Sequence, residues 1–315
     1  MTGHVPRQVT LIVNPSAGGG RAARALPAVE ARLVALGLGL EVDATRDLGH
    51  AGELAVAAAR RGRVVVTLSG DGMLGKVAGA LREVPDAVVG VLPGGRGNDF
   101  ARVAGIPLDP EAACDVIAHG QPRAIDLGEA GGTPFIGIAS LGFDSDANRI
   151  ANKAPARLGA LVYVYGALGA LVGWKQAAFS IEVDGERVSF TGWGVAIANS
   201  KAYGGGMLVA PDAELDDGAL DVVRLERTSK ARFLRSVLPK VFKGEHIHEP
   251  SVHVLRGAEV RVGADRPFTV YADGDPIGEL PLTFRAVPGA LRVLLPPPPA
   301  APQGAEPRDG GTPWA

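Results

Sequence analysis

The first third of the chain alternates short apolar runs with longer segments whose apolar positions recur every three to four residues. The short runs predict strands and the longer segments predict helices. Their order is strand 8–14, helix 21–36, strand 40–44, helix 51–60, strand 63–68, helix 75–82 and strand 87–92. Strands that alternate with helices at this spacing predict a parallel, doubly wound α/β domain.

Beyond about residue 124 the pattern changes to a two-residue alternation of apolar and polar positions, typical of half-exposed strands. Asp184-Gly185 separates two such runs and is a strong signal for a tight hairpin. Strands are expected at 178–183, 187–190, 194–198, 219–225, 259–262, 268–272 and 280–286. These strands predict a second domain that is all-β and mostly antiparallel.

Three segments depart from this scheme. Residues 158–174 form an uncharged stretch of 17 residues between Arg157 and Lys175. We expect a buried helix packed between the two domains; a membrane-touching helix and a membrane span are the alternatives. Residues 229–243 carry a basic helical pattern. The Pro-rich end, residues 296–315, predicts a disordered tail.

Composition narrows the class of protein. Apolar residues make up 46% and charged residues 21% of the chain, and the formal charge is −2. These values suit a cytoplasmic enzyme and argue against a nucleic-acid partner. The N-terminus lacks the layout of a signal peptide. The single cysteine, Cys114, excludes an internal disulfide and predicts a small buried residue, and His246 and His248 are expected in a loop rather than at a metal.

Three glycine-rich loops each follow a predicted strand: residues 14–20, 69–73 and 93–100. In a parallel sheet all three lie at the carboxyl edge, where open α/β folds bind ligands. Glycines let the backbone approach a phosphate, and helix N-termini direct unpaired N–H groups toward its charge. One such loop is weak evidence, because glycines at strand ends are often only turns. Three on one edge predict a phosphate-binding site.

Asp71 stands between two glycines of the second loop. A carboxylate repels phosphate, but Mg²⁺ can bridge carboxylate and phosphate oxygens. The loops match neither the Walker A sequence nor the dinucleotide-binding glycine pattern. The residues themselves therefore favour an enzyme that transfers a phosphoryl group from a magnesium–nucleotide complex.

The three loops resemble those of the diacylglycerol kinase catalytic family, whose relatives include sphingosine, ceramide and, more distantly, NAD kinases. The resemblance continues through Ser140 to Asp144, Ala198 to Ser200, Gly204 to Gly206, Pro211 to Asp221 and Asp273 to Asp275, in matching order over about residues 8–295. It implies a nucleotide-binding α/β domain, residues 1–125 with 287–295 returning to it. It also implies a β-sandwich acceptor domain at 126–286.

The resemblance also implies the ligands, ATP and Mg²⁺, and the residues that hold them. Nucleotide contacts fall on Asn14, Pro15, Ser16, Ala17, Gly18, Thr45, Ser69, Gly70, Asp71, Gly72, Met73, Leu74, Gly75, Arg96, Asn98 and Asp99. A structural Mg²⁺ is implied at Asp217, with backbone oxygens of Glu214 and Ala219. The alternative for that last motif is a plain Asp-Gly turn between strands.

The catalytic residues implied by the family are Asp71 and the Asp273-Gly274-Asp275 motif. A carboxylate near the acceptor hydroxyl can take its proton during phosphoryl transfer. We prefer Asp273 as this base, with Asp275 as the alternative, since Asp275 is shorter than the family's glutamate. A hairpin turn at the same motif is compatible with either role.

Three substitutions depart from the family pattern, one of them a pair of neighbouring residues. Met73 and Arg96 replace threonines, and Gly75-Lys76 replaces Asn-Glu. Lost hydroxyls at two nucleotide loops would suit a relative that binds nucleotide without turnover. However, Arg96 and Lys76 bring positive charge toward the phosphates, and a guanidinium is a strong donor to phosphate. We therefore expect an active kinase rather than a binding-only relative.

The acceptor is expected to be a lipid at a membrane surface. Residues 224–243 interleave seven Lys and Arg residues with apolar positions, which suits an anionic bilayer and peripheral membrane association. The alternative is a solvated helix that covers the β domain. An NAD-kinase-like enzyme and a nucleotide sensor without turnover are the competing functions, and the sequence leaves a homodimer open.

Overall fold

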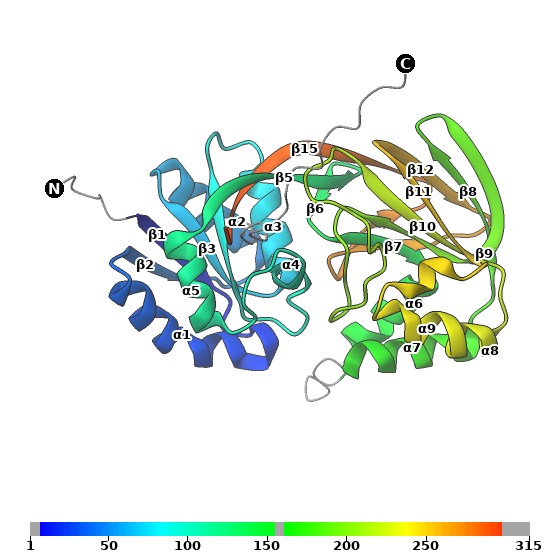
Figure 1. Ribbon diagram of the computed structural model, residues 1–315, viewed down its shortest axis with the longest axis horizontal. Helices are drawn as coiled ribbons and strands as arrows, with labels where there is room; N and C mark the ends of the chain where they lie inside the picture. The colour runs from blue at the N-terminus through cyan, green and yellow to red at the C-terminus, as the bar shows by residue number, and fades with distance from the viewer. Residues whose placement is uncertain (1–6, 155–160, 298–315) are drawn as a thin grey trace, which may run out of the picture.

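The computed structural model describes residues 7–154 and 161–297. The chain forms an α/β half, which contains the first strand, and a β-rich half, and the long strands β5 and β15 join them (Figure 1). The predicted alternation in the first half is confirmed: β1 (Gln8–Val13), α1 (Ala17–Ala35), β2 (Gly39–Ala44), α2 (Leu48–Arg60), β3 (Val64–Ser69), α3 (Asp71–Leu81) and β4 (Val88–Pro93). Two further helices follow, α4 (Asp99–Val103) and α5 (Pro110–His119).

The first half is a doubly wound parallel sheet. Its strands lie in the order β2-β1-β3-β4, all parallel, so their carboxyl ends meet at one edge. Helices α1 and α5 pack against each other, as do α2 and α3. β1, β3 and β4 are buried almost throughout, because helices cover both faces. Cys114 of α5 lies in this core, as expected.

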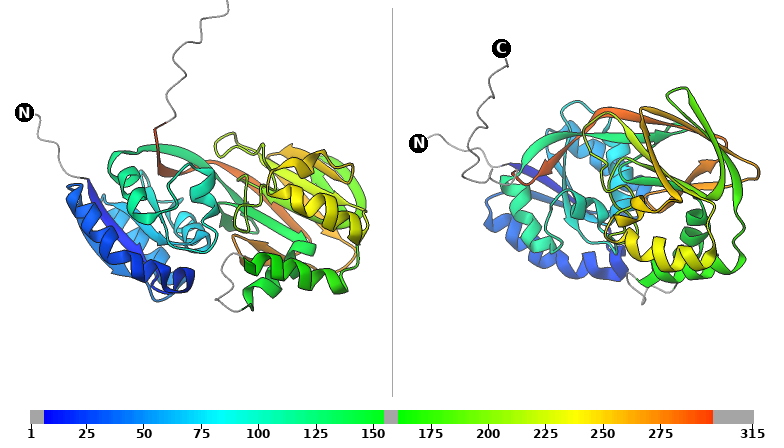
Figure 2. Two further views of the ribbon diagram at one scale, coloured as in Figure 1. Left: turned by 60° about the horizontal axis from the view of Figure 1, so that its bottom comes forward. Right: turned by 45° about the vertical axis from the view of Figure 1, so that its right-hand side comes forward.

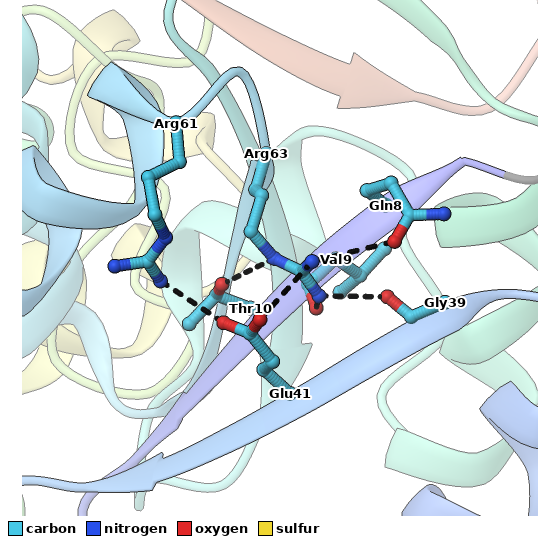
Figure 3. A network of polar contacts seen from close by, with 7 residues as sticks. All are labelled: Gln8, Val9, Thr10, Gly39, Glu41, Arg61 and Arg63. Atoms are coloured by element: carbon cyan, nitrogen blue, oxygen red, sulfur yellow. Dashed lines mark hydrogen bonds and ion pairs between the residues drawn. The ribbon is translucent and has the colours of Figure 1, made fainter.

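The opposite edge of this sheet is held by one guanidinium. Arg63, just before β3, donates from its Nη2 to the carbonyl oxygens of Val9 and Gly39, at 2.7 and 2.8 Å, and from its Nε to Thr10 Oγ1 at 2.9 Å. Glu41 pairs with both Arg61 and Arg63 (Figure 3). The network joins the starts of β1, β2 and β3, away from the glycine-rich loops, and has a structural role.

The second half is a β-rich domain with its own core. Its elements are β5 (Gln121–Ala130), β6 (Thr133–Phe135), β7 (Ile138–Gly142), α6 (Phe143–Asn152), α7 (Leu161–Gly173), β8 (Ala177–Val183), β9 (Glu186–Ala198), β10 (Leu220–Glu226), α8 (Lys230–Arg232), the π-helical turn η2 (Phe233–Val237), α9 (Leu238–Val241), the 3-10 turn η3 (Glu245–His248), β11 (Val252–Gly257), β12 (Glu259–Ala264), β13 (Thr269–Ala272), β14 (Asp275–Glu279) and β15 (Leu282–Leu295). The domain is therefore not purely β, because helical segments cover one side of it (Figure 2).

Two strand predictions in this half were wrong in detail. Residues 187–190 and 194–198 belong to a single strand, β9, which pairs with β8 along its first part and with β7 and β10 along its second. The run predicted at 280–286 starts at Leu282 and extends to Leu295. The predicted hairpin at Asp184-Gly185 is confirmed, with both residues at positive φ, as a two-residue turn requires.

β15 physically couples the halves. Its first part pairs with β12, most of its length pairs antiparallel with β5, and its end pairs parallel with β4 through Arg292 and Val293. Residues 291–295 thereby enter the core of the first half, whereas Phe284 lies in the core of the second. The position at which the sequence predicted the change of domain, 286/287, lies inside this unbroken strand. Most of the predicted tail, 298–315, is outside the described residues.

The prediction of a buried helix over 158–174 was wrong. Residues 158–160 are outside the described part of the chain, and α7 packs against α6 but not between the two halves. Five of its large apolar side chains are exposed, including Val172 at 85%. Across residues 7–154 and 161–297, no helix has the length and apolar character needed to cross a membrane.

The basic segment 230–243 is helical and covers the β domain. Phe233, Val237 and Val241 are buried in its core, whereas Arg232, Arg235 and Lys243 are exposed. Pro239 is tolerated because it stands in the first turn of α9, directly after the π-helical turn. This matches the alternative of a covering helix, and it leaves a basic outer face.

Candidate active site

The three glycine-rich loops converge on one open cleft at the carboxyl edge of the parallel sheet. Its volume is about 360 Å³, and it is lined by Asn14 and residues 16–19, 69–73 and 95–97, together with Asp273 from the second half. The sequence predicted this convergence from strand order alone. It missed Gly19, Gly95 and Gly97, although glycines beside the predicted contacts were a visible signal.

The loops pack so closely that side chains would separate them. A Cβ at Gly95 would lie 2.4 Å from the Cα of Gly70, and one at Gly18 would lie 2.5 Å from the carbonyl oxygen of Gly94. Gly18, Gly19 and Gly20 all have positive φ, so the first loop curls before α1 becomes regular. The glycines thus bring three backbones together around a space that can hold phosphate groups.

Two asparagine side chains brace the loops. Asn14 Oδ1 accepts hydrogen bonds from the backbone N–H and the hydroxyl of Ser16, at 3.1 and 2.8 Å. Asn98, itself in the left-handed conformation, accepts from the backbone N–H of Gly95 at 2.8 Å and donates to the carbonyl oxygen of the same residue. Asn98 does not line the cleft, and its contacts indicate that it shapes the third loop.

Asp71 begins α3 and holds the third loop from across the cleft. Its two carboxylate oxygens accept the backbone N–H groups of Asp99 and Phe100, at 3.1 and 3.0 Å, at the start of α4. The Asp71 carboxylate therefore lies in the first turn of α3 and also caps the start of α4. It also lines the cleft, which is the position that the sequence predicted for a magnesium-binding acid.

Asp99 lies directly behind Asp71. Its Oδ2 accepts the backbone N–H of Gly205 at 2.9 Å, so a loop of the second half contacts it, and its Oδ1 is buried without a hydrogen-bond partner in the structure. Burial and the neighbouring Asp71 raise the pKa of Asp99 to about 6, against the hydrogen bonds from Gly205 and Gly206. An acid with a free buried oxygen beside a second acid favours a proton or a cation at this point.

Asp273 faces the cleft from the turn between β13 and β14. Its carboxylate accepts the backbone N–H groups of Ile136 and Gly137, both at 2.9 Å. Desolvation, Asp71 and Asp275 raise its pKa to about 7, although the two backbone donors act in the other direction. A Cβ at Gly75 would lie 2.8 Å from its Oδ2, so the glycine that replaces the family's asparagine makes room for this acid.

The Asp273-Gly274-Asp275 motif is also a hairpin turn. Asp273 and Gly274 have positive φ, and Ala272 pairs with Asp275 across the two strands. Asp275 does not line the cleft, but its Oδ2 lies 3.9 Å from the position of a Cβ built at Gly72. The turn thus directs one acid into the cleft and places the other beside it.

The acids suit a magnesium ion that is shared with a nucleotide. Within residues 7–154 and 161–297, no cluster of three His, Cys, Asp or Glu side chains is arranged as a complete metal cage. Magnesium bound with nucleotides commonly uses one or two carboxylates, with water and phosphate oxygens completing its shell. Asp71 is the residue that would hold it, and the unpartnered Oδ1 of Asp99 lies behind.

The implied structural metal site fits less well. One oxygen of Asp217 accepts the backbone N–H of Ala219 at 3.0 Å, and the other pairs with the guanidinium of Arg256. Glu214 pairs with Lys201 at 3.1 Å. The guanidinium of Arg256 supplies the positive charge that a cation would otherwise bring to the Asp217 carboxylate. The structure gives this motif the form of an ion-paired turn ahead of β10.

Several residues predicted as nucleotide contacts do not line the cleft: Pro15, Thr45, Leu74, Gly75, Asn98 and Asp99. Thr45 follows β2, and its hydroxyl donates to the carbonyl oxygen of Asp47 at 2.5 Å. Met73 lines the cleft but is only 2% exposed and packs in the core. Its side chain therefore contributes apolar packing at the position where the family has a threonine hydroxyl. Arg96 lines the cleft as expected, whereas Lys76 is exposed outside it.

A second cavity, of about 230 Å³, lies in the other half. Its walls are almost entirely apolar and come from α6, α7, β9, β10 and the helical segment 233–242. Trp193, Val195 and Val223 are among its lining residues. The sequence did not predict this cavity, because its residues are separated by up to a hundred positions and show no local motif.

One end of this cavity is polar. Asp144 and Tyr203 line it and share a side-chain hydrogen bond. Desolvation raises the pKa of Asp144 to about 6 and that of Tyr203 above its usual value, and Asp99 contributes to the latter. Gly204 also lines the cavity, and the next residue donates to Asp99. The polar end of the cavity therefore adjoins the acids of the cleft.

Comparisons with known proteins agree with this architecture. The diacylglycerol kinase catalytic domain model matches residues 8–130, and the YegS C-terminal NAD kinase beta sandwich-like domain matches residues 137–295. The latter bears out the predicted sandwich. A solved structure of a putative diacylglycerol kinase from Bacillus anthracis, 23% identical, superposes with a TM-score of 0.77 over 92% of this chain and 98% of its own, a likeness of fold alone.

Similarity to curated proteins covers nearly the whole chain. A diacylglycerol kinase of Mycobacterium tuberculosis is 34% identical over 93% of this chain and 96% of its own. The diacylglycerol kinase of Bacillus subtilis is 29% identical over 92% and 97%, and a probable YegS-like lipid kinase of Pseudomonas fluorescens is 34% identical over 85% and 89%. With both of its halves matched, the chain is a lipid kinase and belongs to the diacylglycerol kinase catalytic family.

Proposed function

We propose that the protein transfers the γ-phosphate of ATP, with Mg²⁺, to the hydroxyl of diacylglycerol or a closely similar lipid. The observation that carries this proposal is the position of the apolar cavity. Its polar end, at Tyr203 and Gly204, adjoins Asp99 and the acids of the phosphate cleft. A lipid with its chains in the cavity would present its hydroxyl to the cleft.

The three loops would hold the triphosphate. Backbone N–H groups of the loops and the start of α3 favour phosphate oxygens, and Arg96 adds a guanidinium to the lining. Asp71 would hold the magnesium ion at the phosphates. When bound, the ion neutralises charge that develops on phosphate oxygens.

Asp273 would act as the proton acceptor. The acceptor hydroxyl oxygen forms a bond to the γ-phosphorus, and the bond from that phosphorus to the bridging oxygen breaks. ADP leaves with the electron pair, and the hydroxyl proton passes to a carboxylate oxygen of Asp273. A base is most effective when its pKa is near the working pH, which suits the value of about 7 for this group.

Asp144 and Tyr203 would orient the polar part of the acceptor. Their hydrogen-bonded pair is a polar feature in a mostly apolar lining. Buried polar groups discriminate strongly against ligands that leave them unpaired. The cavity also favours a lipid over a dinucleotide such as NAD, because a charged, polar acceptor would gain nothing from walls of Val, Trp and Phe side chains.

A transfer assay with γ-labelled ATP tests this proposal. The purified chain is incubated with diacylglycerol, sphingosine, ceramide or NAD, and labelled products are separated by thin-layer chromatography. We expect label in phosphatidic acid from diacylglycerol, dependent on added Mg²⁺. Label transferred only to NAD would contradict the lipid assignment, and intact ATP binding without transfer to any acceptor would indicate a sensor.

A further inference from the structure

Exposed apolar side chains are concentrated on one helix. Five large ones lie on α7: Leu161 (65% exposed), Val164 (40%), Tyr165 (53%), Leu168 (49%) and Val172 (85%). Their spacing of three, one, three and four residues places them on one face. The other face of α7, with Val162 and Ala170, is buried beside α6. We call the five residues the α7 stripe.

A basic helical segment continues the same rim of the molecule. Lys230 donates a hydrogen bond to the carbonyl oxygen of Val172 at 3.1 Å, so α8 begins against the end of α7. In Figures 1 and 2 both helical segments cover the same side of the β-rich half. Residues 227–243 hold six Lys and Arg residues and no acid, and α7 carries no charge. Leu234 and Phe242 add exposed apolar side chains.

The cations of this segment are only partly neutralised. Arg232 and Lys240 pair with Glu249, at 3.5 and 2.5 Å. Among residues 7–154 and 161–297, no ion pair is formed by Arg235 or Lys243, and both are exposed. An apolar stripe beside unpaired cations has the composition of a surface that binds an anionic bilayer.

The mouth of the apolar cavity lies within this surface. Val164 of the α7 stripe and Phe242 both line the cavity and are exposed, at 40% and 45%. They come from two different walls of the cavity, Val164 from α7 and Phe242 from the end of the 230–242 helical segment. An apolar chain can thus pass between the two segments without leaving apolar surroundings.

We propose that the α7 stripe, together with the basic face of residues 230–243, docks the protein on an anionic lipid bilayer, with the cavity mouth turned toward the membrane. The stripe enters the headgroup region, and Arg235 and Lys243 contact lipid phosphates. The lipid acceptor then enters the cavity through the mouth at Val164 and Phe242. The last step rests on the proposed function, whereas docking itself does not.

Vesicle flotation tests the docking surface directly. The double variant Leu161→Glu/Leu168→Glu places two charges in the stripe, and Val34→Glu places one on an apolar residue of α1 that is 60% exposed in the other half. We expect wild type and the Val34 variant to float with phosphatidylglycerol vesicles. The double variant should lose at least about tenfold in vesicle affinity, since charged side chains are excluded from apolar layers.

Charge reversal tests the basic face separately. Arg235→Glu/Lys243→Glu should abolish the preference for phosphatidylglycerol over phosphatidylcholine vesicles, and added salt should weaken wild-type binding. Arg60→Glu/Arg123→Glu, two exposed cations outside the basic segment, is the matched control and should bind as wild type. Equal flotation of wild type with both vesicle types, or unchanged flotation of the stripe variant, would overturn the proposal.

Two further readouts separate docking from its alternatives. All docking variants should retain wild-type transfer to a water-soluble, short-chain diacylglycerol; loss of that activity in wild type itself would instead count against the proposed function. Light scattering without lipid reports oligomeric state. A wild-type dimer that the stripe variant converts to a monomer would assign the stripe to a second copy of this chain and overturn membrane docking.

Discussion

The two cavities of this molecule differ in almost every physical respect. The cleft is open, and backbone atoms and carboxylates from loops at a single sheet edge build it. The cavity of the β-rich half is lined mainly by apolar side chains from helices and strands that lie far apart in the chain. Phosphate is bound through N–H groups and charge, whereas an aliphatic chain is bound through excluded water and packing. The proposed function accordingly assigns the phosphates to the cleft and the lipid acceptor to the cavity.

The acids between the cleft and the apolar cavity are disfavoured in their charged forms. Desolvation disfavours the charged forms of Asp99 and Asp273, and repulsion by Asp71 adds to the effect at both. Burial and like charge raise the pKa of Asp99 to about 6 and that of Asp273 to about 7, so both acids carry part of a proton near neutral pH. Such a cluster accepts a proton or a cation readily, which is what phosphoryl transfer requires.

The largest expected effect comes from the cleft. Asp71→Asn should lower kcat by at least about 100-fold, because the carboxylate that would hold the magnesium ion at the phosphates is lost. The amide can accept one of the two N–H groups at α4, so melting temperature should fall only slightly. Binding of a fluorescent fatty acid to the cavity should be unchanged. If the variant lost both phosphoryl transfer and fatty-acid binding, the cleft and the cavity would not be separable sites.

A substitution in the apolar cavity should affect the lipid acceptor and leave the nucleotide unaffected. Ala167→Trp fills the cavity from α7 and should raise KM for long-chain diacylglycerol about tenfold, with KM for ATP unchanged. Val34→Trp adds the same side chain to an exposed position of α1, outside the cavity and the α7 stripe, and serves as the control in a detergent-micelle assay. A parallel rise in KM for ATP would mean that the cavity does not bind the acceptor.

A pH profile can separate the two candidate bases. If Asp273 is the base, kcat/KM rises with pH through about 7, because only its deprotonated form accepts a proton. Asp275→Asn removes a charge that raises the pKa of Asp273, so the rising limb should move to lower pH while activity is kept. Near-complete loss of activity in this variant would assign the base to Asp275 instead.

The Asp273→Asn variant tests the catalytic base less directly than the pH profile does. Both carboxylate oxygens accept backbone N–H groups, and an amide would turn its own N–H₂ group toward one of these donors. A loss of activity in that variant has to be interpreted together with its melting temperature, which reports whether the fold is intact. A well-folded Asp273→Asn variant with full activity would exclude the role in catalysis.

The smallest expected effect concerns the Asp217 turn. Because Arg256 already neutralises this carboxylate, a chelator should leave the wild-type melting temperature unchanged. Arg256→Met should cost about 0.5–1 kcal/mol, typical of a partly exposed ion pair. Millimolar Mg²⁺ should restore part of that loss only in the variant. If the chelator lowered the melting temperature of the wild type, the Asp217 turn would be a structural metal site.

The cleft was largely predictable from the sequence because its determinants are local. A glycine-rich stretch after a buried strand marks a sheet edge wherever the strand lies, and parallel order brings such stretches together. Asp71 could be assigned on the same ground. The cavity had no such marker, because Asp144, Trp193 and Val223 carry no periodicity that relates them.

Two features that local sequence patterns could not decide have the same origin. An uncharged run such as 158–174 is equally compatible with a core helix and with a helix that exposes half of its apolar surface, since exposure depends on what packs beside it. For Asp217, the partner is Arg256, which lies 39 positions away and is brought near by the pairing of β10 with β11. No local pattern contains that contact.

The sequence by itself determined the order of strands and helices, the phosphate-binding loops and the identity of the acids among them. These features depend on the conformational freedom of glycine and on apolar periodicity, which neighbouring residues decide. Only the tertiary structure decided the apolar cavity, the exposure of α7, the pairing of Asp217 with Arg256 and the raised pKa values of Asp99 and Asp273. Those properties arise from burial and distance between groups far apart in the chain, and folding alone brings such groups together.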